Sequence, residues 1–360
     1  MIPVVFLGSM NPTHHKYFKN LTYFKNLTES ILWVSDTIDP EALKKFCEVN
    51  GHPTFIVGDN AFSISSNHFE KIYTTVVRGL ELEFMKFQHL KFVDIVPTTE
   101  YCFNFIINKK QINRYLLIKL VEYFQFQNFN YTWSGIGKEF DLSEIIQQWN
   151  QLDSNQTTYT SDLRNCILHP VEIDERFFYS SEPKASNVNI QNYGNNLSTW
   201  NNWLENLFSS SAVSLISESV RYQHSSVFTE KTLYSILGLT FPLFVGGYGH
   251  ANGLEKIGFD IFSDVIDHSY QYRDTLWERC YYAIYLNQQI LSDLSLATHL
   301  RNQHHKRLIN NRRMLYNGQL TNHIQETIQA WPDELAIPVL AICNQLRQAE
   351  FILNQTIVPT

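Results

Sequence analysis

Short apolar runs alternate with mixed apolar and polar stretches along the N-terminal part of the chain. The runs are rich in β-branched or aromatic residues, and several end in Gly or Asp, as buried strands do. They lie at Val4–Gly8, Ile31–Asp36, Thr54–Asp59 and Lys91–Pro97. Between the second and third runs, Pro40 suits the first turn of a helix that Gly51 would end. Strands that alternate with helices predict parallel βαβ units.

The same alternation begins again near Tyr101. Strands are predicted at Cys102–Lys109, Asn130–Gly135, Ser211–Ser219 and Phe241–Gly246. Amphipathic helices are predicted at Arg114–Phe124 and directly after Phe228. Residues 139–201 are rich in Asn, Gln, Ser and Thr and are assigned to helices and long loops. After Asp274 the pattern is helical, and the last helix carries Pro338 near its start. We therefore expect an α/β protein with two successive units and C-terminal helices.

Composition narrows the functional classes. The chain has 360 residues, 44% of them hydrophobic, which is typical of a folded protein with a large core. The formal net charge of −7 argues against strong non-specific binding to nucleic acid. Five scattered cysteines form neither a zinc pattern nor a disulfide framework. With no predicted signal peptide or membrane anchor, we expect a cytoplasmic protein with no membrane partner.

The segment FTEKTLYSILGLTFPLFVGG, from Phe228 to Gly247, carries the most specific chemistry. Thr229 can cap a helix, and Glu230 and Lys231 follow in its first turn. Free backbone N–H groups and the positive end of the helix dipole favour an anion such as a diphosphate there. Lys231 adds a positive charge, and Glu230 offers acceptor oxygens to hydroxyl groups. On the spacing of the residues alone, an ordinary capped helix that carries a solvated Glu–Lys pair is the plainer interpretation.

This segment resembles the donor site of GT-B glycosyltransferases related to α-1,3-fucosyltransferases, and is similar to virus- and bacterium-encoded relatives. In that pattern a turn of the type (F/Y)-x-(T/S)-E-K precedes a helix, and an apolar strand containing Pro and ending in Gly follows. Here Thr229, Glu230, Lys231 and Pro242 fill the pattern. The resemblance reaches upstream to SLISES and downstream to LEKIGFDIFSDVIDHSY. A weaker likeness lies at 104–124, and the N-terminal part is unmatched.

The resemblance implies two Rossmann-like domains that face a cleft, with C-terminal helices that pass back toward the first domain. Residues 1–100 would form the acceptor-side domain, 101–295 the nucleotide-sugar domain, and 296–360 the terminal helices. The implied donor is a UDP- or GDP-sugar. Lys231 would pair with its diphosphate and Glu230 with ribose or sugar hydroxyls. Because relatives occur in viruses, a modified base in phage DNA is one candidate acceptor, and the compartment would then be the host cytoplasm.

Further site candidates follow predicted strands. The implied nucleotide-sugar site includes Glu218, Thr229, Glu230, Lys231, Asn108, Lys109, Arg114, Gly246 and Gly247. Cations near Arg114 would neutralise the leaving diphosphate, although a solvated helix start is an equal alternative. A base for the acceptor hydroxyl would come from His14, His15 or Asp36. No metal-ligand spacing appears, so no metal is expected.

Two other functional classes stay open. One is a non-catalytic protein that keeps a nucleotide-sugar site, and the other is an interaction protein on an α/β scaffold. The sequence places the basic residues that could contact DNA on one helical stretch, with Arg301, Lys306, Arg307, Arg312 and Arg313, where a solvated face is the plainer interpretation. The enzyme hypothesis requires the turn near Glu230 to border a crevice and not to be packed into the interior.

Overall fold

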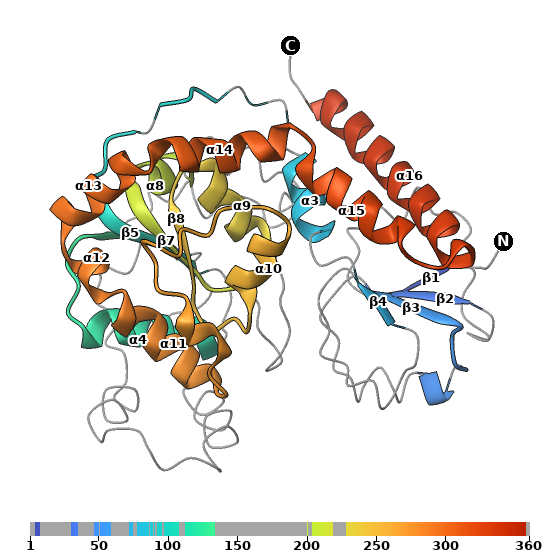
Figure 1. Ribbon diagram of the computed structural model, residues 1–360, viewed down its shortest axis with the longest axis horizontal. Helices are drawn as coiled ribbons and strands as arrows, with labels where there is room; N and C mark the ends of the chain where they lie inside the picture. The colour runs from blue at the N-terminus through green and yellow to red at the C-terminus, as the bar shows by residue number, and fades with distance from the viewer. Residues whose placement is uncertain are drawn as a thin grey trace.

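The protein is an α/β structure with two parallel sheets, shown as a computed structural model in Figure 1. The structure describes residues 4–7, 30–34, 47–49, 51–58, 72–74, 78–85, 87–88, 90, 92–95, 97–107, 112–133, 200, 204–218 and 228–357. The first sheet has the order β1-β2-β3-β4 and the second the order β6-β5-β7-β8. Every strand pairing within them is parallel.

The first sheet contains β1 (Val4–Leu7), β2 (Ile31–Val34), β3 (Phe55–Gly58) and β4 (Ile72–Thr74). The predictions for the first three are confirmed, and residues 47–49 are helical, as expected before Gly51. Among the described strands the order follows the sequence with no reversal, so the expected Rossmann-like reversal is not seen in this sheet.

The strand predicted at Lys91–Pro97 is wrong. Residues 92–95 are not a strand, and the side chains of Val93 and Ile95 are exposed. Asp94 between them instead pairs with Arg312 and Arg313 of a C-terminal helix. A short apolar run cannot by itself distinguish a buried strand from a linker that is held by polar contacts. The fourth strand is β4, which the apolar pattern did not reveal.

The second sheet contains β5 (Tyr101–Ile107), β6 (Phe129–Trp133), β7 (Ser211–Ile216) and β8 (Phe241–Phe244), close to the predicted ranges. Its β5 and β7 are almost continuously apolar and buried, as strands covered on both faces must be. From β5 the chain first forms β6 on one side and then β7 on the other. The order of connection therefore reverses between β5 and β7.

Helices cover both faces of the second sheet. On one face lie α4 (Ile112–Tyr123), α11 (Leu276–Leu286), α12 (Gln288–Ser292) and α13 (Leu294–Gln303), whose apolar side chains share one core with the strands. On the other lie α8 (Glu205–Ser209), α9 (Glu230–Leu237) and α10 (His250–Lys256). Helix α14 (His305–Tyr316) contributes to both cores, with Leu308 in the first and Leu315 in the second. A 3₁₀ helix, η5 (Ser269–Tyr272), precedes α11.

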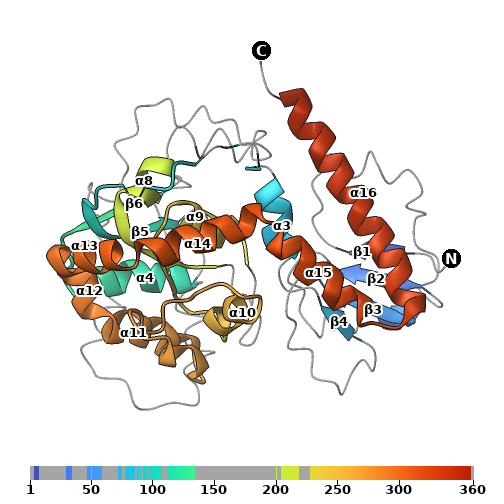
Figure 2. The ribbon, with the colours of Figure 1, turned by 45° about the horizontal axis from the view of Figure 1, so that its top comes forward.

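The C-terminal helices link the two sheets. From α14 the chain continues through α15 (Gln319–Gln329) to α16 (Asp333–Ile357), which lies beside the first sheet in both views (Figures 1 and 2). Leu335 and Val339 of α16 share a core with Trp33 of β2, and the Trp331 ring contacts Tyr73 of β4. Helix α3 (Arg78–Met85) belongs to this same core. The last helices thus return to the N-terminal sheet.

Arg301, in the last turn of α13, joins the segment before β5 to the second sheet. Its side chain is fully buried and donates hydrogen bonds to the carbonyl oxygens of Gly238 (2.9 Å) and Leu239 (3.0 Å), directly after α9. It also donates to Thr99 Oγ1 at 3.2 Å. Burial lowers the pKa of Arg301 to about 9. The guanidinium therefore acts as a structural clamp that satisfies carbonyls at a helix end.

Replacing Arg301 with methionine is expected to lower the free energy of unfolding by about 2–4 kcal/mol, because several buried acceptors lose their donor. Denaturation in urea measures the change. The matched control is Arg313→Met, which removes a guanidinium that is 62% exposed and pairs with Asp94. A surface ion pair of this kind contributes about 0–1 kcal/mol. Equal losses in the two variants would contradict the clamp role of Arg301.

Candidate functional site

The candidate site lies at the carboxyl ends of β5 and β7, where the order of connection reverses. In open parallel sheets, ligands bind outside the carboxyl ends of the strands at such a switch point. After β5 the chain leads to Asn113 and Arg114 at the start of α4, and after β7 it leads to Ser217 and Glu218. Asn113 Nδ2 donates to Ser217 Oγ (2.9 Å) and to the Glu218 carbonyl oxygen (2.7 Å). The fold thus brings together residues more than a hundred positions apart.

Glu218 organises the turn that precedes α9. Its carboxylate accepts hydrogen bonds from the Thr229 backbone N–H (2.9 Å), from Thr229 Oγ1 and from Thr232 Oγ1 (2.7 Å). Only 1% of Glu218 is exposed, so it is not a surface carboxylate. Burial raises the pKa of Glu218, while the nearby Lys231 acts in the opposite direction. Glu218 therefore contacts the donor-site turn directly, as an internal acceptor.

Thr229 is the N-cap of α9, as the sequence predicts. Its backbone is extended, and its Oγ1 accepts from the Lys231 backbone N–H at 3.4 Å. Thr229 and Glu230 are half-buried, so this turn is neither fully exposed nor packed wholly into the interior. Residues 219–227, which lead into the turn, are outside the described residues. The expected crevice beside the turn stays a prediction.

Glu230 and Lys231 form an ion pair at 2.6 Å between Glu230 Oε1 and Lys231 Nζ. The Lys231 side chain is 6% exposed and that of Glu230 30%, so the interpretation as a fully solvated pair is wrong for the lysine. Lys231 Nζ also donates to Thr229 Oγ1 at 3.3 Å. Burial would raise the pKa of Glu230, but the charge and hydrogen bond of Lys231 lower that pKa to about 2. Glu230 thus stays ionised throughout the physiological range.

Arg114 is also buried at this edge of the sheet, with only 1% of its surface exposed. Its Nε donates to the Ser217 carbonyl oxygen at 3.5 Å. The alternative of a solvated helix start is therefore wrong for Arg114, which lies beside the end of β7. Asn108 and Lys109, proposed with it, lie outside the described residues, as do the candidate bases His14, His15 and Asp36.

Gly246 and Gly247 follow β8 but do not form an open loop. Gly246 has φ +86°, and a Cβ there would lie 2.8 Å from Leu276 Cδ1 and 3.0 Å from Cys280 Sγ. A Cβ on Gly247 would overlap the His250 ring. Close protein packing therefore requires these glycines, which the sequence analysis placed in the implied nucleotide-sugar site. Arg279 Nε donates a hydrogen bond to the Gly246 carbonyl oxygen at 3.1 Å.

Sequence reasoning missed two polar residues of this region, Asn113 and Arg279. Asn113 directly precedes the predicted Arg114, and its Oδ1 is a buried acceptor without a hydrogen-bond partner among the described residues. Arg279 is fully buried and also donates to the carbonyl oxygen of Arg273 at 2.7 Å. The available signal was a polar residue beside apolar helix positions, but the hydrogen-bond partners of both residues are supplied by the tertiary fold.

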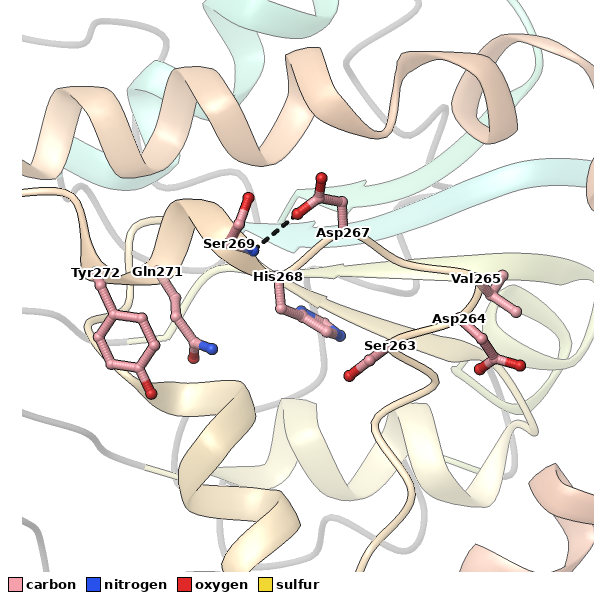
Figure 3. Close-up of a pocket in the computed structure, with 8 residues that line it drawn as sticks. All are labelled: Ser263, Asp264, Val265, Asp267, His268, Ser269, Gln271 and Tyr272. Carbon is pink, nitrogen blue, oxygen red and sulfur yellow. Dashed lines mark hydrogen bonds between the residues drawn. The ribbon is translucent and has the colours of Figure 1, made fainter.

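A pocket of about 560 Å³ lies elsewhere, along residues 263–272 (Figure 3). None of the switch-point residues lines it. In the part of the chain that the structure describes, no group of three or more His, Cys, Asp or Glu side chains is placed to hold a metal ion. Within the same residues, no helix has both the length and the apolar character needed to cross a bilayer.

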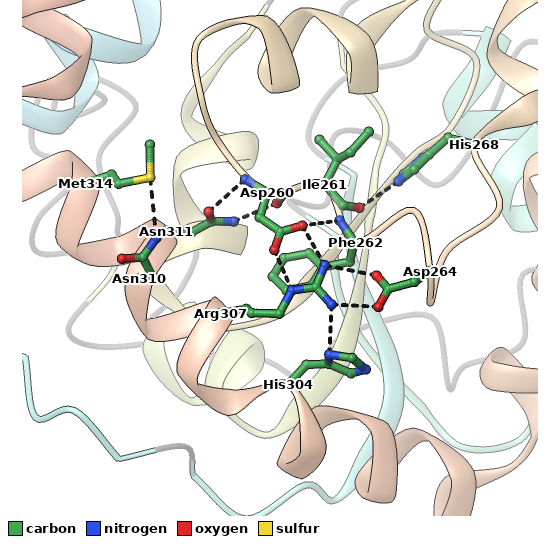
Figure 4. A network of polar contacts seen from close by, with 10 residues as sticks. All are labelled: Asp260, Ile261, Phe262, Asp264, His268, His304, Arg307, Asn310, Asn311 and Met314. Atoms are coloured by element: carbon green, nitrogen blue, oxygen red, sulfur yellow. Dashed lines mark hydrogen bonds and ion pairs between the residues drawn. The ribbon is translucent and has the colours of Figure 1, made fainter.

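Of the five basic residues on the arginine-bearing helices, Lys306 and Arg313 are exposed, as the solvated-face interpretation suggests. Arg301 and Arg312 are buried, and Arg312 Nη2 donates to the Val93 carbonyl oxygen at 2.7 Å. Arg307 forms ion pairs with Asp260 and Asp264 at 2.5 and 2.7 Å (Figure 4). Arg313 pairs with Asp94. All four arginines already have hydrogen-bond or ion-pair partners within the protein, including the exposed Arg313, so they do not form the free basic footprint that DNA binding needs.

Comparison of the chain with family models, with curated proteins and with solved structures gives no match. The resemblance to GT-B glycosyltransferases therefore depends on the residues of the motif and on where the fold places them.

Proposed function

We propose that this protein is a nucleotide-sugar-dependent glycosyltransferase with a GT-B-like arrangement. The donor diphosphate would bind at the carboxyl edge of the second sheet, between the start of α4 and the start of α9. The observation that carries the proposal is the convergence of Arg114, Glu218 and Lys231 at the switch point between β5 and β7. These residues come from three segments of the motif pattern, and a chance resemblance would not require them to meet.

Each residue would have a distinct role. Lys231, together with the backbone N–H groups at the start of α9, would bind the diphosphate and stabilise the charge that grows as the glycosidic bond breaks. Glu230, whose carboxylate is partly exposed, would accept hydrogen bonds from donor hydroxyls. Glu218 would position the turn through Thr229 and Thr232. Binding requires the Lys231 ammonium to share its Glu230 contact with a phosphate oxygen.

A second candidate is a non-catalytic nucleotide-sugar-binding protein. It is favoured by the internal partners of Lys231, which already satisfy the ammonium without a ligand. Such a site could hold a nucleotide sugar tightly without promoting bond cleavage. The two candidates predict the same ligand class and differ in turnover.

Thermal unfolding with a panel of UDP-, GDP- and CMP-sugars tests both candidates. A ligand at about 100 times its Kd stabilises the native state by about 2.7 kcal/mol, which raises the apparent Tm by several degrees. We expect one nucleotide class to raise the Tm and its sugar to be released or transferred on incubation. A Tm rise with no loss of intact donor would favour the binding protein. No Tm change with any donor would overturn both candidates.

A further inference from the structure

The pocket along residues 263–272 has a defined place in the fold. This segment follows β8, the last strand in the order β6-β5-β7-β8. The Phe262 ring contacts Phe241, the first residue of β8, and the Gln271 carbonyl accepts from the Gly249 N–H at 3.3 Å, beyond its other end. The pocket therefore lies beside β8, and none of its lining residues belongs to the proposed donor site.

The walls of the pocket combine hydrogen-bond donors and acceptors with one aromatic ring. Ser263, Ser269 and Gln271 contribute hydroxyl and amide groups, and Tyr272 forms one end with a ring whose residue is 49% exposed (Figure 3). The Gln271 Oε1 accepts from the Asn252 N–H at 3.3 Å. These groups can both donate to and accept from a ligand.

The charged groups of the pocket disfavour an anion. The Arg307 guanidinium donates hydrogen bonds to both Asp264 and Asp260 (Figure 4). Its positive charge is therefore already neutralised by these two carboxylates. No Lys or Arg lines the pocket. Asp267 is exposed and accepts from the Ser269 N–H at 2.8 Å through Oδ1. Its second carboxylate oxygen is left to accept from a ligand hydroxyl.

His268 adds a buried polar ring to the wall of the pocket. It lines the pocket, is 6% exposed, and its Nε2 lies 2.8 Å from the Ile261 carbonyl oxygen. Because a carbonyl only accepts, Nε2 carries the proton and Nδ1 is an acceptor in the neutral ring. Nδ1 has no partner among the described residues, and burial lowers the pKa of His268, which favours that neutral ring. Because Nδ1 itself is closed to solvent, a ligand in the pocket would contact the other polar groups of the walls.

We infer that this pocket is a carbohydrate-binding site, separate from the proposed donor site and independent of glycosyl transfer. A sugar offers neutral hydroxyls that match the mixed donors and acceptors of the walls. Its apolar ring face can stack on Tyr272, whose ring is fixed by an edge contact with Tyr248. A phosphate would lack a cation, and a simple hydrocarbon would leave the polar walls without partners.

Saturation-transfer NMR on the full chain tests this inference. The probes are the methyl glycosides of glucose, galactose, mannose and fucose, together with N-acetylglucosamine and putrescine. We expect transfer to at least one sugar, with Kd raised at least about fivefold by Tyr272→Ala and by Asp267→Ala. Tyr285→Ala is the matched control, since Tyr285 is 48% exposed but lies on α11 outside the pocket. The Tyr285→Ala variant is expected to bind the sugar with the same Kd as the unmodified protein.

A Lys231→Met arm separates this site from the proposed donor site. Sugar binding should survive in that variant even when nucleotide-sugar binding is lost, and it should survive if no nucleotide sugar binds at all. If the sugar signals disappear in Lys231→Met, the sugar binds at the switch point and the inference is overturned. Binding of putrescine alone, no sugar binding, or signals unchanged in both pocket variants would overturn it as well.

Discussion

Replacing Glu218 with alanine is expected to lower the free energy of unfolding by about 3 kcal/mol and to abolish nucleotide-sugar binding. The change leaves the Thr229 N–H and the hydroxyls of Thr229 and Thr232 without their common acceptor. An unsatisfied buried polar group costs about 1–3 kcal/mol, and relief of the buried carboxylate offsets part of the sum. Because Thr229 caps α9, the turn that would bind the diphosphate loses its position too.

Urea denaturation of Glu218→Ala, Glu218→Gln and Glu255→Ala measures this effect. Glu255 is an exposed glutamate on α10, so its variant should change stability by less than about 0.5 kcal/mol. Glutamine keeps the shape of the side chain and one acceptor oxygen, so Glu218→Gln should lower the free energy of unfolding less than Glu218→Ala does. An alanine variant as stable as Glu255→Ala would show that Glu218 does not hold the turn.

The pH dependence of stability gives a second readout. Burial raises the pKa of Glu218 above its ordinary value of 4.5, so folding favours the protonated form. The stability that this preference contributes is complete below the ordinary pKa and is lost as the pH rises through the raised one. Glu218→Gln removes this titration. Its stability should therefore fall less than that of the unmodified protein as the pH rises above 4.5.

The sequence predicted the second sheet well because its signals are local. Its strands are short, mainly apolar runs, and α9 begins at a Thr cap followed by an apolar stripe, so residues within one segment determine each element. The failure at Lys91–Pro97 has the opposite cause. Asp94 is held by arginines more than two hundred positions later, and no local pattern contains that contact.

The candidate site could be predicted only in part for the same reason. The motif located Thr229, Glu230 and Lys231, but the burial of Lys231 depends on neighbouring segments. Asn113 joins the site through hydrogen bonds to the end of β7, and this contact depends on which strands are neighbours. Gly246 has a positive φ and lies against Leu276 and Cys280. This glycine, which the sequence assigned to the ligand site, therefore has a packing role. These contacts depend on which strands are neighbours, and the order of the strands cannot be derived from the sequence alone.

Replacing Lys231 with methionine is expected to reduce donor turnover at least about a hundredfold, because it removes the cation proposed to stabilise the leaving diphosphate. Methionine keeps an unbranched side chain of similar length, so the buried space near Thr229 stays filled. The matched control is Lys119→Met. Lys119 is also buried and pairs with a nearby glutamate, Glu122, at 3.0 Å, but it lies inside α4 beyond the switch point.

Kinetics and acid stability together distinguish a catalytic from a structural role of Lys231. Glu230 has a pKa of about 2 in the folded protein, so its contribution to stability is complete above its ordinary value of 4.5 and is lost as the pH falls toward 2. Lys231→Met removes the main cause of that lowered pKa, and its stability should therefore depend less on pH between 2 and 4.5. If turnover is unchanged while this pH dependence disappears, the ion pair exists but serves only the fold. If turnover falls equally in Lys119→Met, the loss reflects general destabilisation, and the role of Lys231 in donor binding is wrong.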